Sequence, residues 1–336
     1  MLGAIIGDIS GSKYEFNNLR DENLTILDDD CFFTDDTVCT IACMDWLIHA
    51  EEKNKLTATE YLRKWTKRYP HAGYGGRFRQ WILSDNPKPY MSYGNGAAMR
   101  ISPVAFFAYN VECLINLTNT FTSITHNHLE GMKGALTISS CIYMALRGYK
   151  KEQIAKYAIR QYPEISSLEY KKLQKTYQFD ETCQGSVPQA IYCFLISNNF
   201  EDCIKKTVGI GGDCDTTASM SGAIAEAYYG IPKEIIKKAK LFLDQDMVEV
   251  INEFYEKKFE KYVDRHSDYK ITKEELKQAR EWEEKHQKNV ENTPIEELKV
   301  NGELPKWVLR YANAKMVRAQ LLKELEVEQY VFKQHC

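Results

Sequence analysis

The apolar residues of this chain recur at helical spacing over most of its length, and no segment alternates as a β-strand does. The pattern is clearest over residues 37–50, 131–147, 186–197 and 217–229. The last of these stretches is rich in small residues, which let neighbouring helices approach closely, and Gly230 is a favourable residue to end it. We therefore predict an all-α fold with the small-residue helix at its centre.

The pattern changes after about residue 265, where charged residues dominate. Thr272 and Glu275 have the spacing of a capping box, and Thr293 followed by Pro294 predicts a second helix start. One apolar face of a last helix is predicted by Ala314, Val317, Leu321 and Leu325. We predict a first domain over residues 1–265 and a charged helical extension over residues 266–336. That extension is either solvated, or packed on the first domain or on a partner.

The bulk composition excludes several classes of protein. The 336 residues are 44% hydrophobic and 27% charged, which is enough to bury a large core. A net charge of -3 provides no general attraction to nucleic acid or to an acidic membrane. No apolar run approaches the roughly 20 residues that span a bilayer, and the first residues do not resemble a signal peptide. We expect a cytoplasmic protein, and nothing in the composition indicates its oligomeric state.

Ten cysteines raise the question of disulfides or a zinc site. Cys39, Cys43, Cys141 and Cys193 lie inside apolar helical runs, and the chain contains no CxxC pair. We expect reduced, mostly buried thiols and no structural zinc site.

Candidate chemistry lies in three acidic segments: "GDISGSKYE" at 7–15, "TDDT" at 34–37 and "GIGGDCDTT" at 209–217. The second and third lie at predicted helix starts, so one interpretation is helix capping, which favours Asp and Thr. A single cap needs only one such residue. Capping therefore explains neither the adjacent pair Asp35 and Asp36 nor the Asp-x-Asp spacing of the third segment.

A cation site is the second interpretation of these segments. If the two helix starts converge, their four carboxylates meet, and Glu15 can add a fifth. Buried together without cations, such groups repel one another at a cost of several kcal/mol. Carboxylates and threonine hydroxyls are oxygen ligands, which suit Mg²⁺ or Mn²⁺ rather than zinc or copper. We therefore predict a binuclear site with two Mg²⁺ (or Mn²⁺) ions.

Two further features have a structural and a functional interpretation. The loop "SYGNGA" at 92–97 is either an ordinary turn or a diphosphate site, because Gly94 and Gly96 let backbone N–H groups approach phosphate oxygens. Arg100 either reaches a phosphate or forms a structural ion pair, and we favour the ion pair. Phe32 and Phe33, just before the second acidic segment, are expected to pack into the core.

Several motifs in a fixed order resemble the ADP-ribosylglycohydrolase family over about residues 1–260. They are "GDxxGxxxE" at 7–15, "TDDT" at 34–37, "GYGGRF" at 73–78, "SYGNGAAMR" at 92–100, "THNHLEG" at 125–131, "SVPQAIYCFL" at 186–195 and "GGDCDTTASMSGAIAEAYYG" at 211–230. One motif alone is weak, whereas the ordered set is specific.

The resemblance implies a compact orthogonal multi-helix fold in which residues 1–265 form the catalytic domain. It also implies two Mg²⁺ or Mn²⁺ ions and hydrolysis of an N- or O-glycosidic bond at C1″ of ADP-ribose. The implied metal ligands are Thr34, Asp35, Asp36, Asp213, Asp215 and Thr216. The implied proton acceptor is Glu15, on a mobile segment, or a metal-bound carboxylate such as Asp35. Asp8 is expected to be structural.

The resemblance also assigns residues to the substrate. The expected contacts are Ser92, Tyr93, Gly94, Asn95, Gly96, His126 and Tyr177, with Phe179 nearby. Cys214 departs from the family, where a small or hydroxyl residue is common. If its thiol faces away from the ions it is inert, and otherwise it makes the site sensitive to thiol reagents.

We expect a hydrolase that removes ADP-ribose from a modified protein or a small molecule. The linkage to arginine is our first choice, followed by serine-linked ADP-ribose and O-acetyl-ADP-ribose. Two other functions stay open: a non-catalytic ADP-ribose-binding protein, and a metal-dependent phosphohydrolase of nucleotide diphosphates. No membrane partner is expected, and nucleic acid is not an expected partner either.

Overall fold

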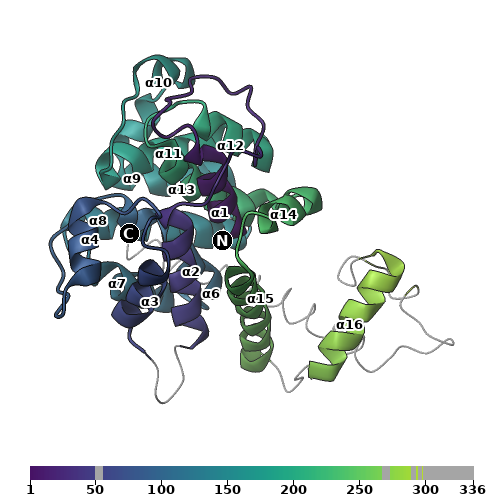
Figure 1. Cartoon of the computed structure of the whole chain (residues 1–336). Coiled ribbons are helices and arrows are strands. Elements are labelled where there is room, and N and C mark those ends of the chain that lie inside the picture. The colour runs from purple at the N-terminus through teal and green to yellow at the C-terminus, as the bar shows by residue number, and fades with distance from the viewer. Residues whose placement is uncertain (50–55, 267–272, 289–292, 294–296, 298–336) are drawn as a thin grey trace. The chain divides into compact units, whose positions relative to one another are not determined.

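The computed structural model describes residues 1–49, 56–266, 273–288, 293 and 297. Within these residues the chain forms helices and turns and no strand, with one isolated antiparallel bridge between Gly94 and Thr182. The all-α prediction is therefore confirmed for the described residues (Figure 1). The helices are α1 (Leu2–Ser12), α2 (Asp35–Ile48), α3 (Ala58–Arg68), α4 (Gly76–Leu83), α5 (Gly96–Met99), α6 (Ser102–Phe107), α7 (Val111–Ser123), α8 (Leu129–Leu146), α9 (Lys151–Gln161), the 3₁₀-helix η1 (Pro163–Ser167), α10 (Tyr170–Thr176), α11 (Cys183–Ile196), α12 (Phe200–Val208), α13 (Cys214–Tyr229), α14 (Lys233–Lys240), α15 (Gln245–His266) and α16 (Lys273–His286).

The four helices predicted from periodicity are present as α2, α8, α11 and α13. Each begins two or three residues before its predicted start. Gly230 ends α13 with φ 76°, a left-handed conformation that glycine adopts without steric penalty.

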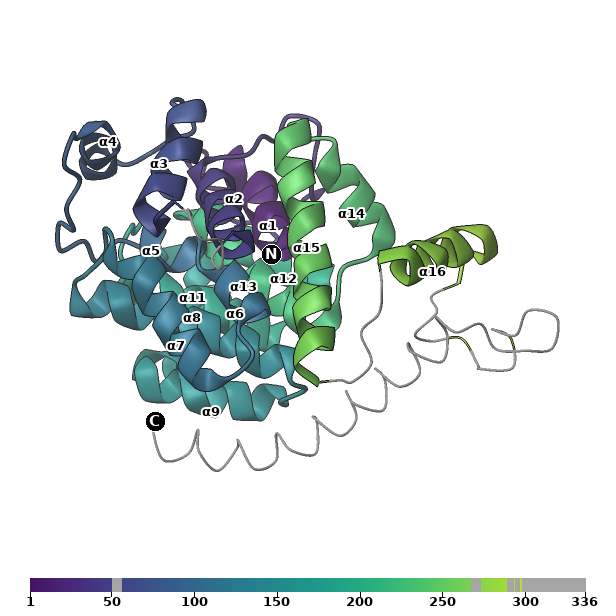
Figure 2. The same ribbon diagram turned by 90° about the horizontal axis from the view of Figure 1, so that it is seen from below.

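The small-residue helix α13 lies at the centre, as predicted, and packs against α1, α8, α11 and α12 (Figure 2). Its closest neighbour is α1, where Gly3, Gly7 and Gly11 recur at a spacing that places them on one helix face. A Cβ atom at Gly7 would lie 2.0 Å from the carbonyl oxygen of Ala218, and one at Gly11 would lie 2.4 Å from the Cα of Asp215. Only glycine allows this approach, which brings the end of α1 against the start of α13.

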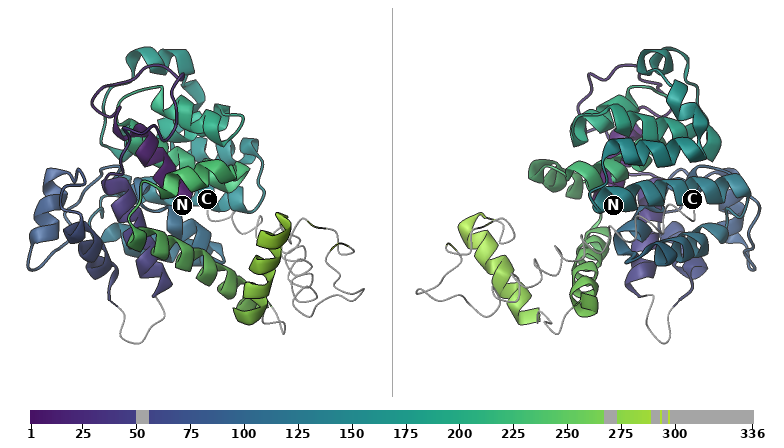
Figure 3. Two further views of the ribbon diagram at one scale, coloured as in Figure 1. Left: turned by 45° about the vertical axis from the view of Figure 1, so that its right-hand side comes forward. Right: turned by 180° about the vertical axis from the view of Figure 1, so that it is seen from behind.

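The segment that follows α1 carries Glu15 and arches beside α10 and α12 (Figure 3). Asn18 and Arg20 anchor it. The N–H of Gly212 donates to Asn18 Oδ1 at 3.0 Å, and Arg20 Nη1 donates to the carbonyl oxygens of Gln174 at 2.9 Å and Ile210 at 3.2 Å. The Glu15 segment is thus tied to the turn that precedes Asp213.

The chain divides into two units, Met1–Phe254 and Tyr255–Cys336. In the second unit Arg280 Nη1 lies 2.9 Å from Glu256 Oε1, so α16 is paired with the middle of α15. The domain boundary at residue 265 stays a prediction. The capping residue Thr272, Pro294 of the second helix start, and the helix face from Ala314 to Leu325 lie outside the described residues.

No helix in the described ranges is long and apolar enough to cross a membrane. All nine cysteines of those ranges are free, and all but Cys113 are buried. Cys39, Cys43, Cys141 and Cys193 are fully buried in helices, as expected.

The expectation for Phe32 is wrong, because its side chain is 55% exposed. Phe33 is half-buried and packs edge-on against Tyr69, with ring centroids 5.5 Å apart. Hydrogen bonds rather than aromatic packing hold this turn: the N–H of Phe32 donates to Ser12 Oγ at 3.0 Å and that of Thr34 to Asp8 Oδ2 at 3.0 Å. The turn therefore needs no apolar wedge.

Candidate functional site

The starts of α2 and α13 converge at the end of α1, as the acidic segments predict. Two trios of carboxylates result: Asp8, Asp36 and Asp215 in one, and Glu15, Asp213 and Asp215 in the other. Within each trio one oxygen of every residue lies within 4.8 Å of the others. Asp215 belongs to both trios, so the two groups form one acidic cluster.

Side-chain capping does not explain this cluster. Thr34 is the N-cap of α2, and its side chain accepts the N–H of Asp36 at 3.4 Å. Asp213 is the N-cap of α13, yet its side chain makes no capping hydrogen bond. Asp215 Oδ1 accepts the N–H of the next residue, Thr216, at 2.8 Å, so helix capping accounts for neither Asp36 nor Asp213.

Asp8 holds the beginning of α2 in place. Its carboxylate accepts the N–H of Thr34 and of Thr37, each at 3.0 Å, and also the hydroxyls of both threonines. This geometry fits the structural role expected for Asp8. Its membership of a carboxylate trio was not predicted, and the signal available was its position one turn before Gly11 on the helix that leads to Glu15.

Asp36 has one satisfied and one unsatisfied oxygen. The side chain is 1% exposed, Oδ2 accepts the hydroxyl of Thr216 at 3.0 Å, and Oδ1 has no hydrogen-bond partner. A buried carboxylate oxygen without a donor is unfavourable by several kcal/mol unless a cation or an ordered donor satisfies it. The absence of a donor for Asp36 Oδ1 is therefore the feature of the site that best fits a bound cation.

Burial and mutual repulsion raise the pKa values of the cluster. Burial is the largest cause at each residue, and the charges of neighbouring acids add to it. The pKa of Glu15 rises to about 7 and that of Asp35 to about 8, while those of Asp36, Asp213 and Asp215 also lie above the ordinary range. Divalent cations among these oxygens would remove the repulsion that causes part of these shifts.

The ligand set fits hard divalent cations. All of its atoms are oxygens, and Asp215 contributes to both trios. Asp35 is half-buried and belongs to neither trio. The hydroxyls of Thr34 and Thr216 donate to Asp8 and Asp36 and keep lone pairs for a cation. The assignment of these residues as ligands stays a prediction.

The loop over residues 92–96 lies against the segment before α11. The N–H of Asn95 donates to the carbonyl oxygen of Glu181 at 2.7 Å, and Asn95 Nδ2 donates to Asp213 Oδ2 at 2.6 Å. The loop is therefore connected directly to the acidic cluster. The N–H of Gly94 donates to Ser92 Oγ at 3.2 Å and is engaged within the loop, while Tyr93 is 45% exposed.

Arg100 forms no ion pair within the described residues, so that prediction is wrong. Its side chain is 1% exposed and lies between the rings of Phe78 and Phe121, with Thr125 accepting a hydrogen bond from Nη2 at 2.6 Å. Aromatic faces and a hydroxyl take the place of the expected carboxylate. His126, which follows Thr125 in the chain, is also buried, and its ring faces the 92–96 loop.

Tyr177 is buried behind the acidic cluster. Its hydroxyl donates to the carbonyl oxygen of Gly185 at 2.9 Å, and a Cβ atom at Gly212 would lie 2.7 Å from its ring. It therefore supports the turn before Asp213, and its contact with substrate stays a prediction. Phe179 is 43% exposed and stacks on Phe16, with centroids 5.9 Å apart; sequence reasoning did not identify Phe16.

Cys214 faces α1 rather than the carboxylates. Its buried thiol donates to the carbonyl oxygen of Gly11 at 3.5 Å, and it belongs to neither trio. Burial, followed by the charges of Asp215 and Asp213, raises the pKa of this thiol well above its ordinary value. The geometry favours the inert alternative over sensitivity to thiol reagents.

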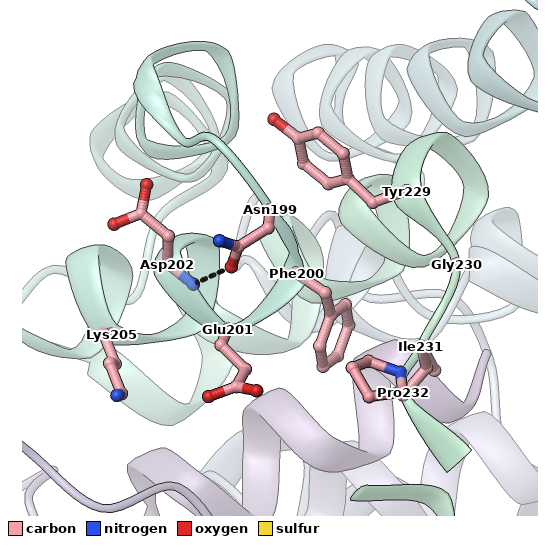
Figure 4. A pocket seen from close by; sticks show the side chains of 9 residues that line it. All are labelled: Asn199, Phe200, Glu201, Asp202, Lys205, Tyr229, Gly230, Ile231 and Pro232. Atoms are coloured by element: carbon pink, nitrogen blue, oxygen red, sulfur yellow. Dashed lines mark hydrogen bonds between the residues drawn. The ribbon is translucent and has the colours of Figure 1, made fainter.

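A separate cavity of about 610 Å³ lies at the other end of α13 (Figure 4). It is lined by Tyr229 and Gly230, by the first turns of α12, and by Pro232. The sixteen residues of α13 separate it from Asp213 by about 24 Å at 1.5 Å per residue. No predicted site residue lines it, so this cavity is distinct from the candidate site.

The family model described as ADP-ribosylglycohydrolase matches residues 1–265. The ADP-ribosylhydrolase ARH3 of Mus musculus is 26% identical over 306 residues, covering 69% of this chain and 83% of the relative.

Two bacterial relatives are also similar. The ADP-ribosylarginine hydrolase Tri1 of Pseudomonas putida is 24% identical over 268 residues, covering 71% of this chain and 72% of the relative. The ADP-ribosyl-[dinitrogen reductase] glycohydrolase of Rhodospirillum rubrum is 27% identical over 173 residues, covering 50% of this chain and 54% of the relative. A solved structure described as an ADP-ribosylglycohydrolase-related protein complex shares the fold, with a TM-score of 0.57, 21% identity, and coverage of 76% of this chain and 95% of that one.

Proposed function

This chain belongs to the ADP-ribosylglycohydrolase family, and we propose that it hydrolyses the glycosidic bond at C1″ of ADP-ribose with two divalent cations held by its acidic cluster. The observation that carries the proposal is the pair of carboxylate trios that share Asp215, together with the unpartnered Asp36 Oδ1. The cluster lies beside Glu15 and is connected through Asn95 to the loop expected to bind substrate.

Mg²⁺ or Mn²⁺, when bound, would polarise the distal ribose hydroxyls and activate a water. The proposed ligands are Thr34, Asp35, Asp36, Asp213, Asp215 and Thr216, and Asp8 and Glu15 complete the two trios. The contribution of the protein is to fix these oxygens: the Asp8 hydrogen bonds hold the first turn of α2, and the Gly11 contact holds α1 against the Asp215 backbone.

Glu15 is the first choice as the group that takes the proton of the attacking water, and Asp35 is the second. Glu15 is half-buried on a segment outside the helices, and its carboxylate lies within 4.8 Å of an oxygen of Asp213 and of Asp215. Asp35 lies beside the cluster but in neither trio.

We assign the ADP-ribose moiety to the surface formed by Ser92, Tyr93, Gly94, Asn95, Gly96 and His126. The connection of Asn95 to Asp213 supports this assignment, because it joins the loop to the centre that would act on C1″. The target carrying ADP-ribose is a modified protein or a small molecule. An arginine linkage is the first choice, because the relative from Pseudomonas putida is an ADP-ribosylarginine hydrolase.

The test is a panel of arginine-linked, serine-linked and O-acetyl-linked ADP-ribose substrates, assayed with Mg²⁺, with Mn²⁺ and after chelation. We expect release of free ADP-ribose that stops on chelation and returns with metal. AMP plus ribose phosphate as products would identify a phosphohydrolase instead. Tight binding of ADP-ribose without turnover of any substrate would identify a non-catalytic binding protein.

A further inference from the structure

Arg100 is a buried cation without an acidic partner among the described residues. It follows α5 directly, is 1% exposed, and has its guanidinium carbon 5.7 Å from the ring centroid of Phe78 and 5.5 Å from that of Phe121. An arginine side chain stays charged in proteins and has only hydrogen-bond donors. Its polar neighbours must therefore accept, which determines the direction of the hydrogen bonds around it.

The hydrogen bonds lead from Arg100 to His126 through Thr125. Arg100 Nη2 donates to Thr125 Oγ1 at 2.6 Å, and Thr125 Oγ1 lies 2.7 Å from His126 Nδ1. Because the threonine oxygen accepts from the arginine, its own hydrogen is available for Nδ1. Arg100 Nη2 also lies 3.4 Å from Nδ1, so a proton on Nδ1 would face a second donor. The His126 Nδ1 atom is therefore the acceptor.

The proton of the neutral imidazole is then carried by Nε2. A Cβ atom at Gly96 would lie 3.3 Å from His126 Nε2 and one at Gly94 would lie 3.5 Å from it, so Nε2 faces the 92–96 loop. His126 is only 5% exposed, and its Nε2 has no hydrogen-bond partner among the described residues. The Nε2–H group therefore faces the loop without a protein acceptor and is available to donate to a ligand bound there.

We propose that Arg100 and Thr125 are positioning residues that hold His126 as a neutral Nε2–H donor for a phosphate oxygen of bound ADP-ribose. The choice of ADP-ribose rests on the proposed function, whereas the hydrogen-bond relay stands on the geometry alone. The relay also explains a buried arginine that touches no carboxylate: its charge keeps the imidazole unprotonated on Nδ1. Burial and the Arg100 charge both lower the pKa of His126 well below its ordinary value, in agreement with a neutral ring.

The first experiment reads the tautomer directly in the full-length wild-type protein without ligand. Two-bond ¹H–¹⁵N spectra of ¹⁵N-histidine-labelled protein distinguish protonated from unprotonated ring nitrogens, and a His126→Gln sample identifies the His126 signals by their loss. We expect an unprotonated Nδ1 and a protonated Nε2 at neutral pH. A proton on Nδ1, or on both nitrogens, overturns the relay.

The second experiment compares Thr125→Val with Thr125→Ser. Valine has nearly the shape of threonine but no hydroxyl, whereas serine keeps the hydroxyl. We expect Thr125→Val to bind ADP-ribose about tenfold more weakly in calorimetry and to lose the single His126 tautomer, since one directed hydrogen bond is gone. Thr125→Ser should stay within about threefold of the wild type. Wild-type affinity in a folded Thr125→Val protein overturns the proposal.

The two experiments separate failure of the relay from failure of the proposed function. A wild-type protein that does not bind ADP-ribose refutes the proposed function and with it the ligand named for His126. The tautomer spectrum still decides whether Arg100 and Thr125 orient the ring. Should Thr125→Val not fold, the wild-type spectrum remains the deciding measurement.

Discussion

Two buried aspartates on the same helix, Asp36 and Asp45 of α2, have opposite surroundings. Asp45 is 3% exposed, and its Oδ2 accepts hydrogen bonds from Lys64 Nζ at 2.8 Å and Trp65 Nε1 at 2.7 Å. Asp36 is 1% exposed, and a single threonine hydroxyl donates to it. The remaining charged neighbours of Asp36 are acids, which raise its pKa further after burial has raised it.

The comparison shows that burial alone does not identify a functional carboxylate. Asp45 is a structural residue because α3 supplies both a cation and an indole donor to it. Asp36 lacks a cation or an indole donor from the protein, which supports the proposal that it binds a cation. The identity of the neighbouring side chains therefore separates the two roles, and each role predicts a different response to substitution.

The largest expected difference is in activity. Asp36→Asn and Asp215→Asn should each lower hydrolysis of the preferred ADP-ribose substrate by at least about a hundredfold, because loss of even an outer partner of a metal ligand costs 10–100-fold. Asp45→Asn should keep activity within a few-fold of wild type. The measurement is steady-state turnover at saturating Mn²⁺, and equal losses in Asp36→Asn and Asp45→Asn would remove the distinction between the two sites.

The second difference is in stabilisation by metal. A cation present at about 100 times its dissociation constant should stabilise the wild-type fold by about 2.7 kcal/mol. The same increase should appear in Asp45→Ala and be absent from Asp215→Asn. Denaturant unfolding with and without Mn²⁺, with chelator as the reference, measures it. A metal-induced increase that survives Asp215→Asn would place the cation elsewhere.

The third difference is in the loss of a satisfied buried carboxylate. Asp45→Ala should lower the free energy of unfolding by about 1–3 kcal/mol, because the buried Trp65 Nε1 loses its acceptor. Lys64 is about half exposed, so its ion pair adds little to this loss. Urea unfolding in chelator is the measurement, with Lys64→Ala as the control for the exposed part of the interaction; wild-type stability in Asp45→Ala would contradict the structural role.

The smallest difference has the opposite sign. In chelator, Asp36→Asn should raise the free energy of unfolding by about 1 kcal/mol, the ordinary scale of a single substitution, because it removes one charge from a repelling cluster. Asp45→Asn under the same conditions should not stabilise the protein. A metal-free Asp36→Asn protein less stable than wild type would contradict the interpretation of Asp36 as an unbalanced charge.

Local patterns predict the elements of this protein well and its side-chain environments poorly. Helical periodicity located α2, α8, α11 and α13, because the periodic burial of a helix face is a property of consecutive residues. The environments of Arg100 and Phe32 were predicted wrongly, since each depends on contacts with distant segments: Arg100 lies between Phe78 and Phe121, and Phe32 remains exposed while Asp8 holds its turn.

The sequence by itself determined the fold class, the family and the acidic residue types, because these follow from periodicity, motif order and the chemistry of oxygen ligands. The tertiary structure decided which carboxylates meet. Gly7 and Gly11 let α1 approach α13 closely, so that the end of α1 lies beside the starts of α2 and α13. This packing places Asp8 and Glu15 in the two trios and leaves Asp35 outside them. The physical reason is that carboxylate repulsion and hydrogen bonding act between atoms in space, and the distances between those atoms are fixed only when the helices pack.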